Sequence, residues 1–470
     1  MPEVDRRQFL KLAGAGGAAA VGCEPVERLI PYVVQPEEMT PGMPLFYAST
    51  CQECPAGCGL HVRTREGRPV KLEGNPEHPI NRGALCGRGQ AGIGRTYHPD
   101  RYHQPMLRGG DGEWHPITWE LAAETLAAMI SGAGSKVAIL GGPTGPTLSR
   151  LIDQWMAAVG AGTRVVYEPF AFEALVEASR SVFGVASRPL FDLSDADFVI
   201  DFGAESMESW LSPIEHARQI EEARDVSKHA NGGARLIYVG PRLSTTAGNA
   251  DEWLPAKPGS EGILALAIAR VAFDRARARG RPVGGDPALI GPVLADFSPE
   301  AVASQTEIPA ETIRRIGEAI AASARPAALP PGTALSSQRA VVTTAAVLLL
   351  NAVVGAIGKT VQIVPGAASA EAGSFDDVIR LIGAMKSGDV EVLLIHDSNP
   401  VYSLPPDAGF AAALEQVNFV VSFASIPDET SGKANLILPD HTPLESWGDA
   451  APRAGVRSLI QPSVRPLYDT

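Results

Sequence analysis

The chain has 470 residues, 45% of them hydrophobic and 20% charged, with a formal net charge of −13 at pH 7. This composition excludes a disordered chain and predicts about two to four folded domains with large cores. The acidic balance argues against nucleic acid, and against an anionic membrane surface, as a partner. The most apolar stretch, 345–358, is interrupted by Asn351 and Gly355, so we expect a buried core helix rather than a membrane span.

Residues 1–23 are predicted to be an export signal. Arg6 and Arg7 precede a weakly apolar run at 12–22, an order typical of Tat signals, which carry folded proteins. The segment 20–23, Ala-Val-Gly-Cys, also resembles a lipoprotein cleavage site and predicts lipidation of Cys23. The alternative is that Cys23 is a small apolar residue in a discarded signal. We expect an exported, membrane-associated protein on the periplasmic or extracytoplasmic face.

A linker and three folded segments are expected after the signal. Residues 24–44 contain several prolines and little periodicity, which predicts a linker. A small β-rich domain is expected at 45–110, an α/β domain at 111–330 and a second α/β portion at 331–470. These boundaries are approximate, and the two α/β blocks are allowed to interleave.

Four cysteines, Cys51, Cys54, Cys58 and Cys86, have the spacing C-x2-C-x3-C-x27-C. Three soft thiolate ligands on one tight loop, with a fourth from downstream, predict a [4Fe–4S] cluster. The alternative is a structural zinc site, although zinc usually takes its ligands from C-x2-C pairs and this spacing has one. The segment 61–72 alternates and turns at Glu66-Gly67, so we expect a β-hairpin that brings Cys86 back beside the loop.

Beyond this region, short apolar strands alternate with helices, which predicts parallel sheets with crossover connections. A helix is expected at 147–159. The expected strands are 136–140, 164–167, 197–203, 234–240, 391–396 and 419–423. Such sheets bind ligands in the turns after their strands, although most turns of this composition only reverse the chain. The candidate turns are 141–145, 203–206, 240–244 and 397–400.

The block 51–92, with its segments 73–79 and 85–90, resembles the N-terminal domain of the molybdopterin oxidoreductase family, the bis-guanylate molybdenum and tungsten enzymes. Further matches follow in the family's order, and together they span about 40–465. They lie at 250–255, 257–260, 398–400, 428–430 and 438–439. The resemblance implies a small [4Fe–4S] domain followed by two α/β domains with parallel sheets.

The resemblance also implies roles for individual residues. Arg88 would be an electron relay between cluster and pterin, the alternative being a surface cation. The candidate cofactor-binding residues are Gly240, Arg242, Ser244, Pro258, Gly259, Ser260 and Asn399. Catalytic residues are not assigned.

Four segments resemble one branch of the family, the large iron–sulfur subunit of alternative complex III, a membrane quinol-oxidising complex. These segments are 210–213, 355–361, 399–402 and 444–450. The resemblance implies a molybdopterin fold without molybdenum, with ferredoxin-like iron–sulfur subunits, quinone-reactive membrane subunits and cytochrome c subunits as candidate partners. The chain departs from that branch because its N-terminal cysteine set is complete and no ferredoxin-like part follows.

The chain also departs from the catalytic members of the family. All five cysteines are assigned, so none remains for molybdenum, and a Ser or Asp ligand is left open. Ala204-Glu205-Ser206 replaces the family's Asn-Pro, and we expect no C-terminal pterin-binding barrel in this chain. We therefore favour an electron-transfer subunit of a membrane-bound, quinone-linked oxidoreductase. The alternative is a fragment of a molybdenum enzyme such as a polysulfide, thiosulfate or tetrathionate reductase.

Overall fold

The computed structural model describes residues 40–169, 172–227, 233–332, 338–364 and 373–470. The predicted twin-arginine segment and Cys23 lie outside the described residues. The elements described below belong to the compact unit Pro44–Thr470. No helix in the described part of the chain combines the length and apolarity needed to cross a membrane.

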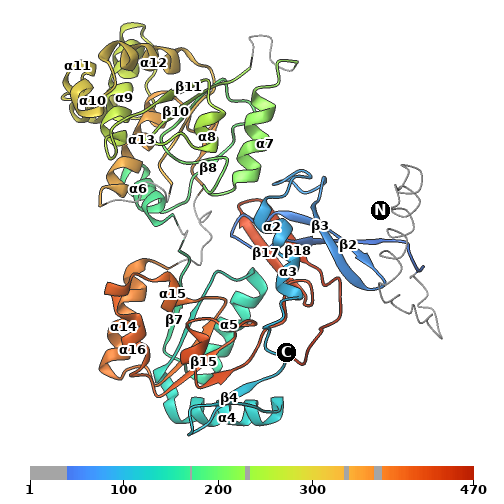
Figure 1. The fold of residues 1–470 in the computed structure, drawn as a ribbon. Helices are drawn as coiled ribbons and strands as arrows, with labels where there is room; N and C mark the ends of the chain where they lie inside the picture. The colour runs from blue at the N-terminus through green and yellow to red at the C-terminus, as the bar shows by residue number, and fades with distance from the viewer. Residues whose placement is uncertain (1–39, 170–171, 228–232, 333–337, 365–372) are drawn as a thin grey trace, which may run out of the picture. The chain divides into compact units, whose positions relative to one another are not determined.

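An antiparallel three-stranded sheet begins this unit (Figure 1). Its strands are β1 (Leu45–Thr50), β2 (Gly59–Arg65) and β3 (Arg68–Gly74), followed by the short helices α2 (Gly87–Ala91) and α3 (Ile93–Thr96). The β2–β3 connection turns at Glu66 and Gly67, with φ of 45° and 74°, the left-handed values that suit a tight hairpin. The predicted hairpin is therefore confirmed.

A four-stranded parallel sheet has the order β11-β10-β9-β12. Its strands are β9 (Phe198–Asp201), β10 (Arg235–Val239), β11 (Glu252–Leu254) and β12 (Pro326–Leu329). Alternate residues of each strand enter opposite cores: Ile237 joins one apolar cluster and Leu236 the other. Helices therefore cover both faces, as is usual for parallel sheets. They are α6 (Glu173–Phe183), α7 (Pro213–Ala223), α8 (Thr245–Gly248), α9 (Glu261–Ala278), α10 (Pro287–Leu294), α11 (Pro299–Thr306), α12 (Ala310–Ala322) and α13 (Ala340–Val353).

Helix α13 is the predicted core helix, shifted toward the N-terminus relative to the predicted range. Asn351, which interrupts its apolar sequence, is completely buried but has hydrogen-bond partners on β12. Its side chain accepts from Ala328 N at 2.9 Å and donates to Ala328 O at 2.7 Å. The helix ends before Gly355, which has a φ of 73°. The polar residue thus fixes the helix to the sheet without leaving a buried polar group unsatisfied.

The largest sheet has seven strands in the order β5-β4-β16-β15-β14-β6-β7. Its strands are β4 (Met106–Arg108), β5 (Trp114–Pro116), β6 (Val137–Gly141), β7 (Thr163–Val166), β14 (Val392–His396), β15 (Phe419–Ser422) and β16 (Leu436–Ile437). Strands β6 and β14 pair in parallel, with Val137 opposite Val392. The chain therefore leaves this sheet after β7, builds the four-stranded sheet and returns. The two α/β blocks interleave in sequence, while the predicted domain boundaries stay predictions.

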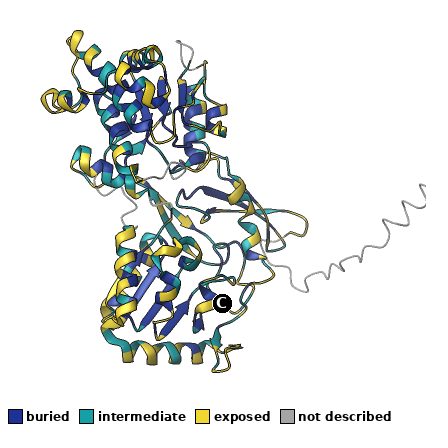
Figure 2. Cartoon of the chain, turned by 60° about the vertical axis from the view of Figure 1, so that its left-hand side comes forward, coloured by how far each residue is buried: buried dark blue, intermediate teal, exposed yellow. Residues whose placement is uncertain are grey.

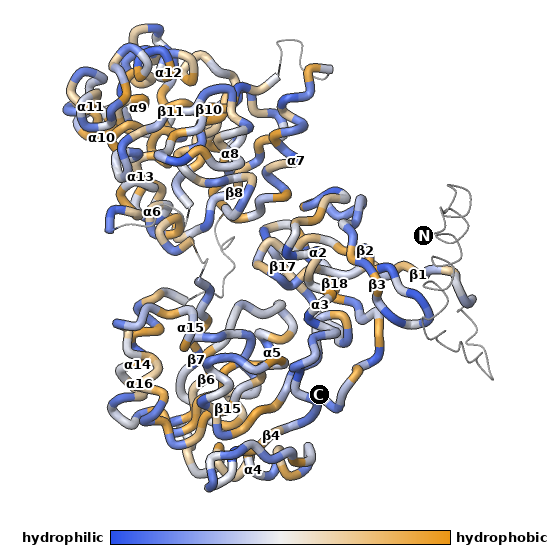
Figure 3. Tube along the Cα trace, viewed as in Figure 1, coloured by the Kyte–Doolittle hydropathy of each residue, from blue (hydrophilic) through white to orange (hydrophobic). Residues whose placement is uncertain are grey.

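Helices cover both faces of the seven-stranded sheet. Leu393 of β14 packs in a cluster with residues of α14 and α16, whereas its neighbour Leu394 packs with residues of α4 and α5. These helices are α4 (Trp119–Ala133), α5 (Pro146–Val159), α14 (Phe375–Ser387), α15 (Pro400–Ser403) and α16 (Phe410–Leu414). The strands are buried while the outer helix faces are exposed (Figure 2), and hydrophobic residues concentrate along the strands and the inner helix faces (Figure 3). The predicted α/β class with parallel sheets is confirmed.

Two small pairs of antiparallel strands complete the description of the strands. Strand β8 (Leu190–Phe191) pairs with β13 (Val361–Gln362), and β17 (Gly448–Arg453) forms a hairpin with β18 (Val456–Ile460). The hairpin reaches the cysteine-bearing sheet, because Thr50 Oγ1 donates to Leu459 O at 2.8 Å. No closed barrel occurs among the described strands.

Candidate functional site

The cysteine loop closes on itself through the backbone. Cys51 N donates to Cys58 O at 2.8 Å, and Gly57, with a φ of 56°, lets the chain turn between them. Cys51 and Cys58 are buried, at 7% and 5% exposure, while Cys54 and Cys86 are partly exposed. The loop therefore presents thiols from both an interior and an outer position.

Asn81 ties the fourth cysteine to this loop. Its Oδ1 accepts from Gly59 N at 2.8 Å, and its Nδ2 donates to Gly59 O at 2.9 Å and to Ala84 O at 2.6 Å. Gly59 follows Cys58 directly, and Ala84 lies two residues before Cys86, so one completely buried side chain joins the two cysteine segments. Sequence analysis missed Asn81, because an asparagine in a turn-rich segment carries no signal of its long-range partner.

The four thiols share one electrostatic environment. Burial raises the pKa of Cys51 and of Cys58 to about 12, and the charges of neighbouring cysteines add to both shifts. Burial also raises the pKa of Cys54, although the charge of Arg88 opposes it. Cys51, Cys54 and Cys58 therefore stay protonated at neutral pH unless a metal takes the proton's position, so metal binding would release protons. By donor type, four thiolates fit an iron–sulfur cluster. Across the described ranges, however, no three His, Cys, Asp or Glu residues, these cysteines included, are grouped as they would be around a single metal ion.

Arg88, the predicted relay, lies on α2 two residues after Cys86. Its side chain borders a pocket of about 750 Å³ that also contains Asn399, so the structure brings two of the predicted site residues together. Within this pocket His396 Nε2 lies 3.0 Å from Asp440 Oδ2. Although burial works against protonation, Asp440 raises the pKa of His396 above its usual value. The pocket connects the helix that follows Cys86 with the turn after β14.

Two acidic side chains, Asp201 and Glu205, accept the hydrogen bonds that stabilise the turn after β9. The carboxylate of Asp201 accepts hydrogen bonds from Ala204 N at 2.6 Å and from Ser206 N at 3.4 Å. The Glu205 carboxylate is buried and accepts from Tyr238 Oη at 2.8 Å and from Arg242 Nη2 at 3.0 Å through the same oxygen. Burial raises the pKa of Glu205, but hydrogen bonds with Glu208, Ser244, Tyr238 and Arg242 together lower it, so the carboxylate is charged at neutral pH. Arg242, a predicted cofactor ligand, is therefore already paired with a carboxylate.

The other predicted cofactor residues of this sheet have local structural roles. Gly240 O accepts from Trp253 Nε1 at 2.8 Å, and Ser244 caps α8 by accepting from Ala247 N at 3.1 Å. Ser260 donates to Lys257 O at 2.6 Å ahead of α9. Pro258 and Gly259 are exposed beside it. Their turns all follow neighbouring parallel strands, so they share one edge of the sheet.

A second internal carboxylate occupies the turn after β6. Asp449 of β17 lies at the first turn of α5, where its carboxylate accepts from Thr147 N at 3.2 Å and from Thr147 Oγ1 at 2.7 Å. Gly145 packs so closely that an added Cβ would overlap Asp449 O. Backbone N–H groups at such turns are the usual phosphate donors of parallel sheets. Here and after β9 they face carboxylates, so these two turns do not fit the diphosphates of a guanylate pterin.

Comparison with known protein families agrees with this architecture. The molybdopterin oxidoreductase profile matches residues 101–470, and the Fe4S4 domain profile of the same family matches residues 45–98. A twin-arginine translocation signal profile matches residues 3–21, which confirms the predicted Tat signal and supports export. The Fe4S4 domain supports the predicted cluster, while the assignment of individual ligands stays a prediction.

Curated relatives extend over nearly the whole chain. The menaquinone reductase molybdopterin-binding-like subunit of Nitratidesulfovibrio vulgaris is 28% identical over 99% of this chain and 70% of its own length. The molybdopterin-containing subunits of the Shewanella arsenate respiratory reductase and the Salmonella typhimurium thiosulfate reductase are 24% and 23% identical over 99% of this chain. This chain spans 64% and 67% of those two proteins.

Among solved structures, acetylene hydratase from Pelobacter acetylenicus has the same fold. The two superpose with a TM-score of 0.74 at 16% identity, over 90% of this chain and 67% of that one.

Proposed function

The chain belongs to the molybdopterin oxidoreductase family and carries its Fe4S4 domain, and from this premise we propose that it is the iron–sulfur electron-transfer subunit of a membrane-bound, quinone-linked respiratory oxidoreductase. Cys51, Cys54, Cys58 and Cys86 hold its cluster. The cluster would supply reversible one-electron transfer. Arg88 serves as the relay between the cluster and the pocket of about 750 Å³.

The proposal that the chain acts without molybdenum rests on the pairing of Glu205 with Arg242. A carboxylate and a diphosphate repel each other, by roughly several kcal/mol when both are desolvated and much less when water screens them. The Glu205 side chain is 4% exposed, so little solvent screens it. Asp449 sets up a weaker conflict at the turn before α5, because it is partly exposed. In both turns the chain's own carboxylates accept the backbone N–H groups that a phosphate would use.

The cellular placement follows from the N-terminal segment and from one relative. Tat export delivers the chain to the periplasmic or extracytoplasmic side, and lipidation of Cys23 would attach it to the membrane. A single lipid chain anchors weakly, so a second contact with partner subunits is needed. The relative from N. vulgaris is named as a menaquinone reductase subunit, which supports partner subunits in general. The partners that we propose are ferredoxin-like iron–sulfur and quinone-reactive membrane subunits.

Metal analysis of the purified, exported protein tests this function. We expect about four iron atoms per chain, no molybdenum or tungsten and no guanylate pterin after acid extraction. A chain purified with stoichiometric molybdenum and guanylate pterin would contradict the proposal. Expression with excess molybdate serves as the control for metal supply.

The second candidate is a piece of a catalytic molybdopterin enzyme, such as a polysulfide, thiosulfate or tetrathionate reductase. One observation favours it: Arg88 and Asn399 border the same pocket of about 750 Å³, which has room for a sizeable ligand. The relatives named as arsenate and thiosulfate reductases add support. Recovery of molybdenum from a longer gene product would favour this second candidate over the electron-transfer subunit.

A further inference from the structure

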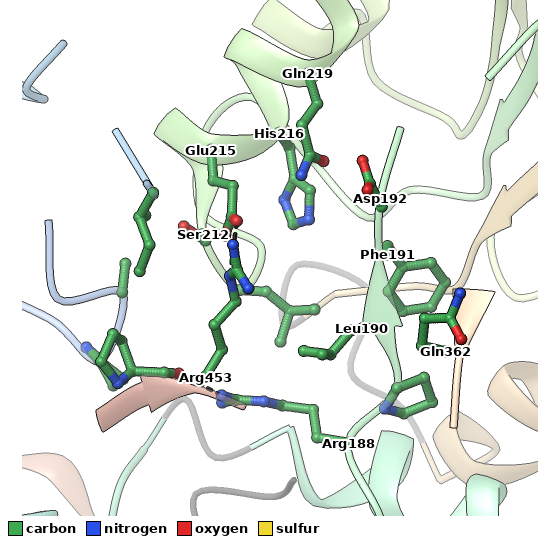
Figure 4. A pocket seen from close by; sticks show the side chains of 16 residues that line it. Arg188, Leu190, Phe191, Asp192, Ser212, Glu215, His216, Gln219, Gln362 and Arg453 are labelled. Carbon is green, nitrogen blue, oxygen red and sulfur yellow. Dashed lines mark hydrogen bonds and ion pairs between the residues drawn. The ribbon is translucent and has the colours of Figure 1, made fainter. Parts of the chain in front are cut away.

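A second, smaller pocket of about 230 Å³ lies against the cysteine loop (Figure 4). We call it the loop pocket. Its apolar wall includes Pro55 and Ala56, which stand between Cys54 and Cys58, and its polar wall includes Arg188, His216 and Arg453. A water molecule takes about 30 Å³ of liquid, so the loop pocket has room for roughly seven waters or one small polar ligand.

Arg188 enters this pocket with most of its donors available. Its Nη2 donates to Pro452 O at 3.0 Å, and no other hydrogen bond of its guanidinium occurs among the described residues. A guanidinium carries five N–H donors and stays charged. Burial lowers the pKa of Arg188, while the charge of Glu215 works in the other direction. A partly buried cation is stabilised by an anion on its unused donors, and the Pro452 carbonyl supplies no charge.

The other charged groups of the loop pocket are accounted for. Arg453 Nε donates to Glu215 Oε1 at 2.8 Å, so these two charges neutralise each other. Asp192 is exposed at the rim, where its carboxylate accepts from Ser194 N at 3.1 Å, and water screens its charge. Glu215 also acts on Arg188 through its charge, so two cations share one carboxylate inside the pocket and its interior carries a net positive charge.

His216 is a second polar side chain in the loop pocket that has a ring nitrogen without a hydrogen-bond partner among the described residues. It extends from α7 into the loop pocket and is 3% exposed, and its Nδ1 has no hydrogen-bond partner in the described part of the chain (Figure 4). Burial lowers the pKa of His216 to about 4, although a backbone hydrogen bond at Trp210 works in the other direction, so the ring is neutral at pH 7. A neutral imidazole has a single N–H, which the Nδ1 tautomer would present to an acceptor in the pocket.

We propose that the loop pocket binds a small oxyanion, held by the guanidinium of Arg188 with His216 as a second donor. Arg188 offers a planar fork that matches the oxygens of a carboxylate or an inorganic oxyanion. The bound charge would lie beside the cysteine loop, because Pro55 and Ala56 form the wall and Gly57 packs on Pro452. Anion binding and cluster reduction therefore oppose each other, a coupling that rests on the proposed cluster.

Isothermal titration calorimetry of the purified full chain tests the site. Sodium sulfate and sodium acetate are the probes, with sodium chloride at equal ionic strength as the reference. We expect one saturable site for sulfate or for acetate, and the probe that binds more tightly identifies the class. Saturation by neither probe would overturn the proposal.

Three variants locate the binding. Arg188→Met should weaken it at least about tenfold, because a charge-assisted hydrogen bond is lost, and Arg188→Lys should retain part of it. Glu215→Gln should tighten it by releasing Arg453, a gain that misfolding cannot produce. Arg279→Met, at the exposed end of α9, is the matched control and should bind as the wild type does. Unchanged affinity in Arg188→Met would refute the assignment.

The redox coupling has its own readout. Reduction of the cluster with dithionite adds negative charge next to the loop pocket, so the anion affinity should fall, and anion binding should lower the cluster's midpoint potential by the equivalent amount. Equal affinity in both redox states would refute the coupling. A chain that binds the anion but contains no iron would refute the proposed cluster and leave the anion site standing.

Discussion

Arg101 and Glu445 form an ion pair whose two side chains are completely buried, with Nη2 2.8 Å from Oε2 and Nη1 3.1 Å from Oε1. They lie 344 residues apart in the chain. Glu445 also accepts from Thr442 N at 2.8 Å and from Leu467 N at 2.9 Å. One carboxylate therefore joins the end of the cysteine-bearing region to the segments around β17 and β18.

Removal of one partner of this pair should destabilise the fold strongly. In Arg101→Leu, Glu445 keeps its charge in a buried site, and such changes cost about 3–5 kcal/mol in the free energy of unfolding. Urea unfolding followed by circular dichroism measures the loss. The exposed pair Arg180–Glu177 is the control, since Glu177→Gln should cost less than about 1 kcal/mol. Equal losses in the two variants would contradict this reading.

The same pair predicts an acid sensitivity. Although burial raises it, the hydrogen bonds from Arg101 and its neighbours lower the pKa of Glu445 overall. The unfolded chain then binds more protons than the folded one, so stability rises with pH in this range. The contribution is fully present above the usual Glu pKa of about 4.3 and is lost as the pH falls through the lower folded value. Glu445→Gln should show a shallower loss of stability between about pH 5 and pH 2 than the wild type.

Asn81 should control cluster occupancy without being a ligand. Asn81→Ala leaves Gly59 N and two backbone carbonyls in a buried site without their partner, at about 1–3 kcal/mol for each unsatisfied group. We expect lower iron content and weaker visible absorption, with secondary structure retained. Asn249→Ala, which removes an exposed amide bonded to Thr245 O, should keep full iron content. Full occupancy in Asn81→Ala would show that the two cysteine segments do not need this link.

Cys58→Ala should lose the cluster or reduce it to a three-iron form, because a buried ligand is removed from the loop. Iron analysis and EPR spectroscopy distinguish the two outcomes. Cys23→Ala is the matched control, as the remaining cysteine of the sequence, and should retain the cluster. An unchanged EPR signal in Cys58→Ala would remove this residue from the ligand set.

Export should depend on the paired arginines. The double change Arg6→Lys and Arg7→Lys should leave the protein in the cytoplasm, because the twin-arginine pair marks Tat signals. Cell fractionation with immunoblotting measures this. Cys23→Ala should still be exported but should appear in the soluble fraction if lipidation is the anchor. Efficient export of the double-lysine variant would be incompatible with the Tat route.

Local patterns predicted much of the fold. The hairpin at β2 and β3, the strands from β6 to β15 that were expected, and the buried helix α13 all follow from alternation or apolar runs within a few residues. Contacts between distant residues could not be predicted this way. Asn81 acts on Gly59 across 22 residues, and Asp449 acts on Thr147 across 302. The acidic turn at Glu205 was recognised, but its partner Tyr238 was not, because no local pattern pairs a turn with a strand residue.

The pairing of β6 with β14 also has a consequence for biosynthesis. Lys136 and Glu391, at the start of these strands, form an ion pair across 255 residues. At a translation rate of about 5–20 residues per second, β14 leaves the ribosome roughly 13–50 s after β6. The β6–β14 pair of the seven-stranded sheet therefore closes only after residues up to His396 have been made. Since the Tat route carries folded proteins, the signal at residues 3–21 must wait for strands that are synthesised long after it.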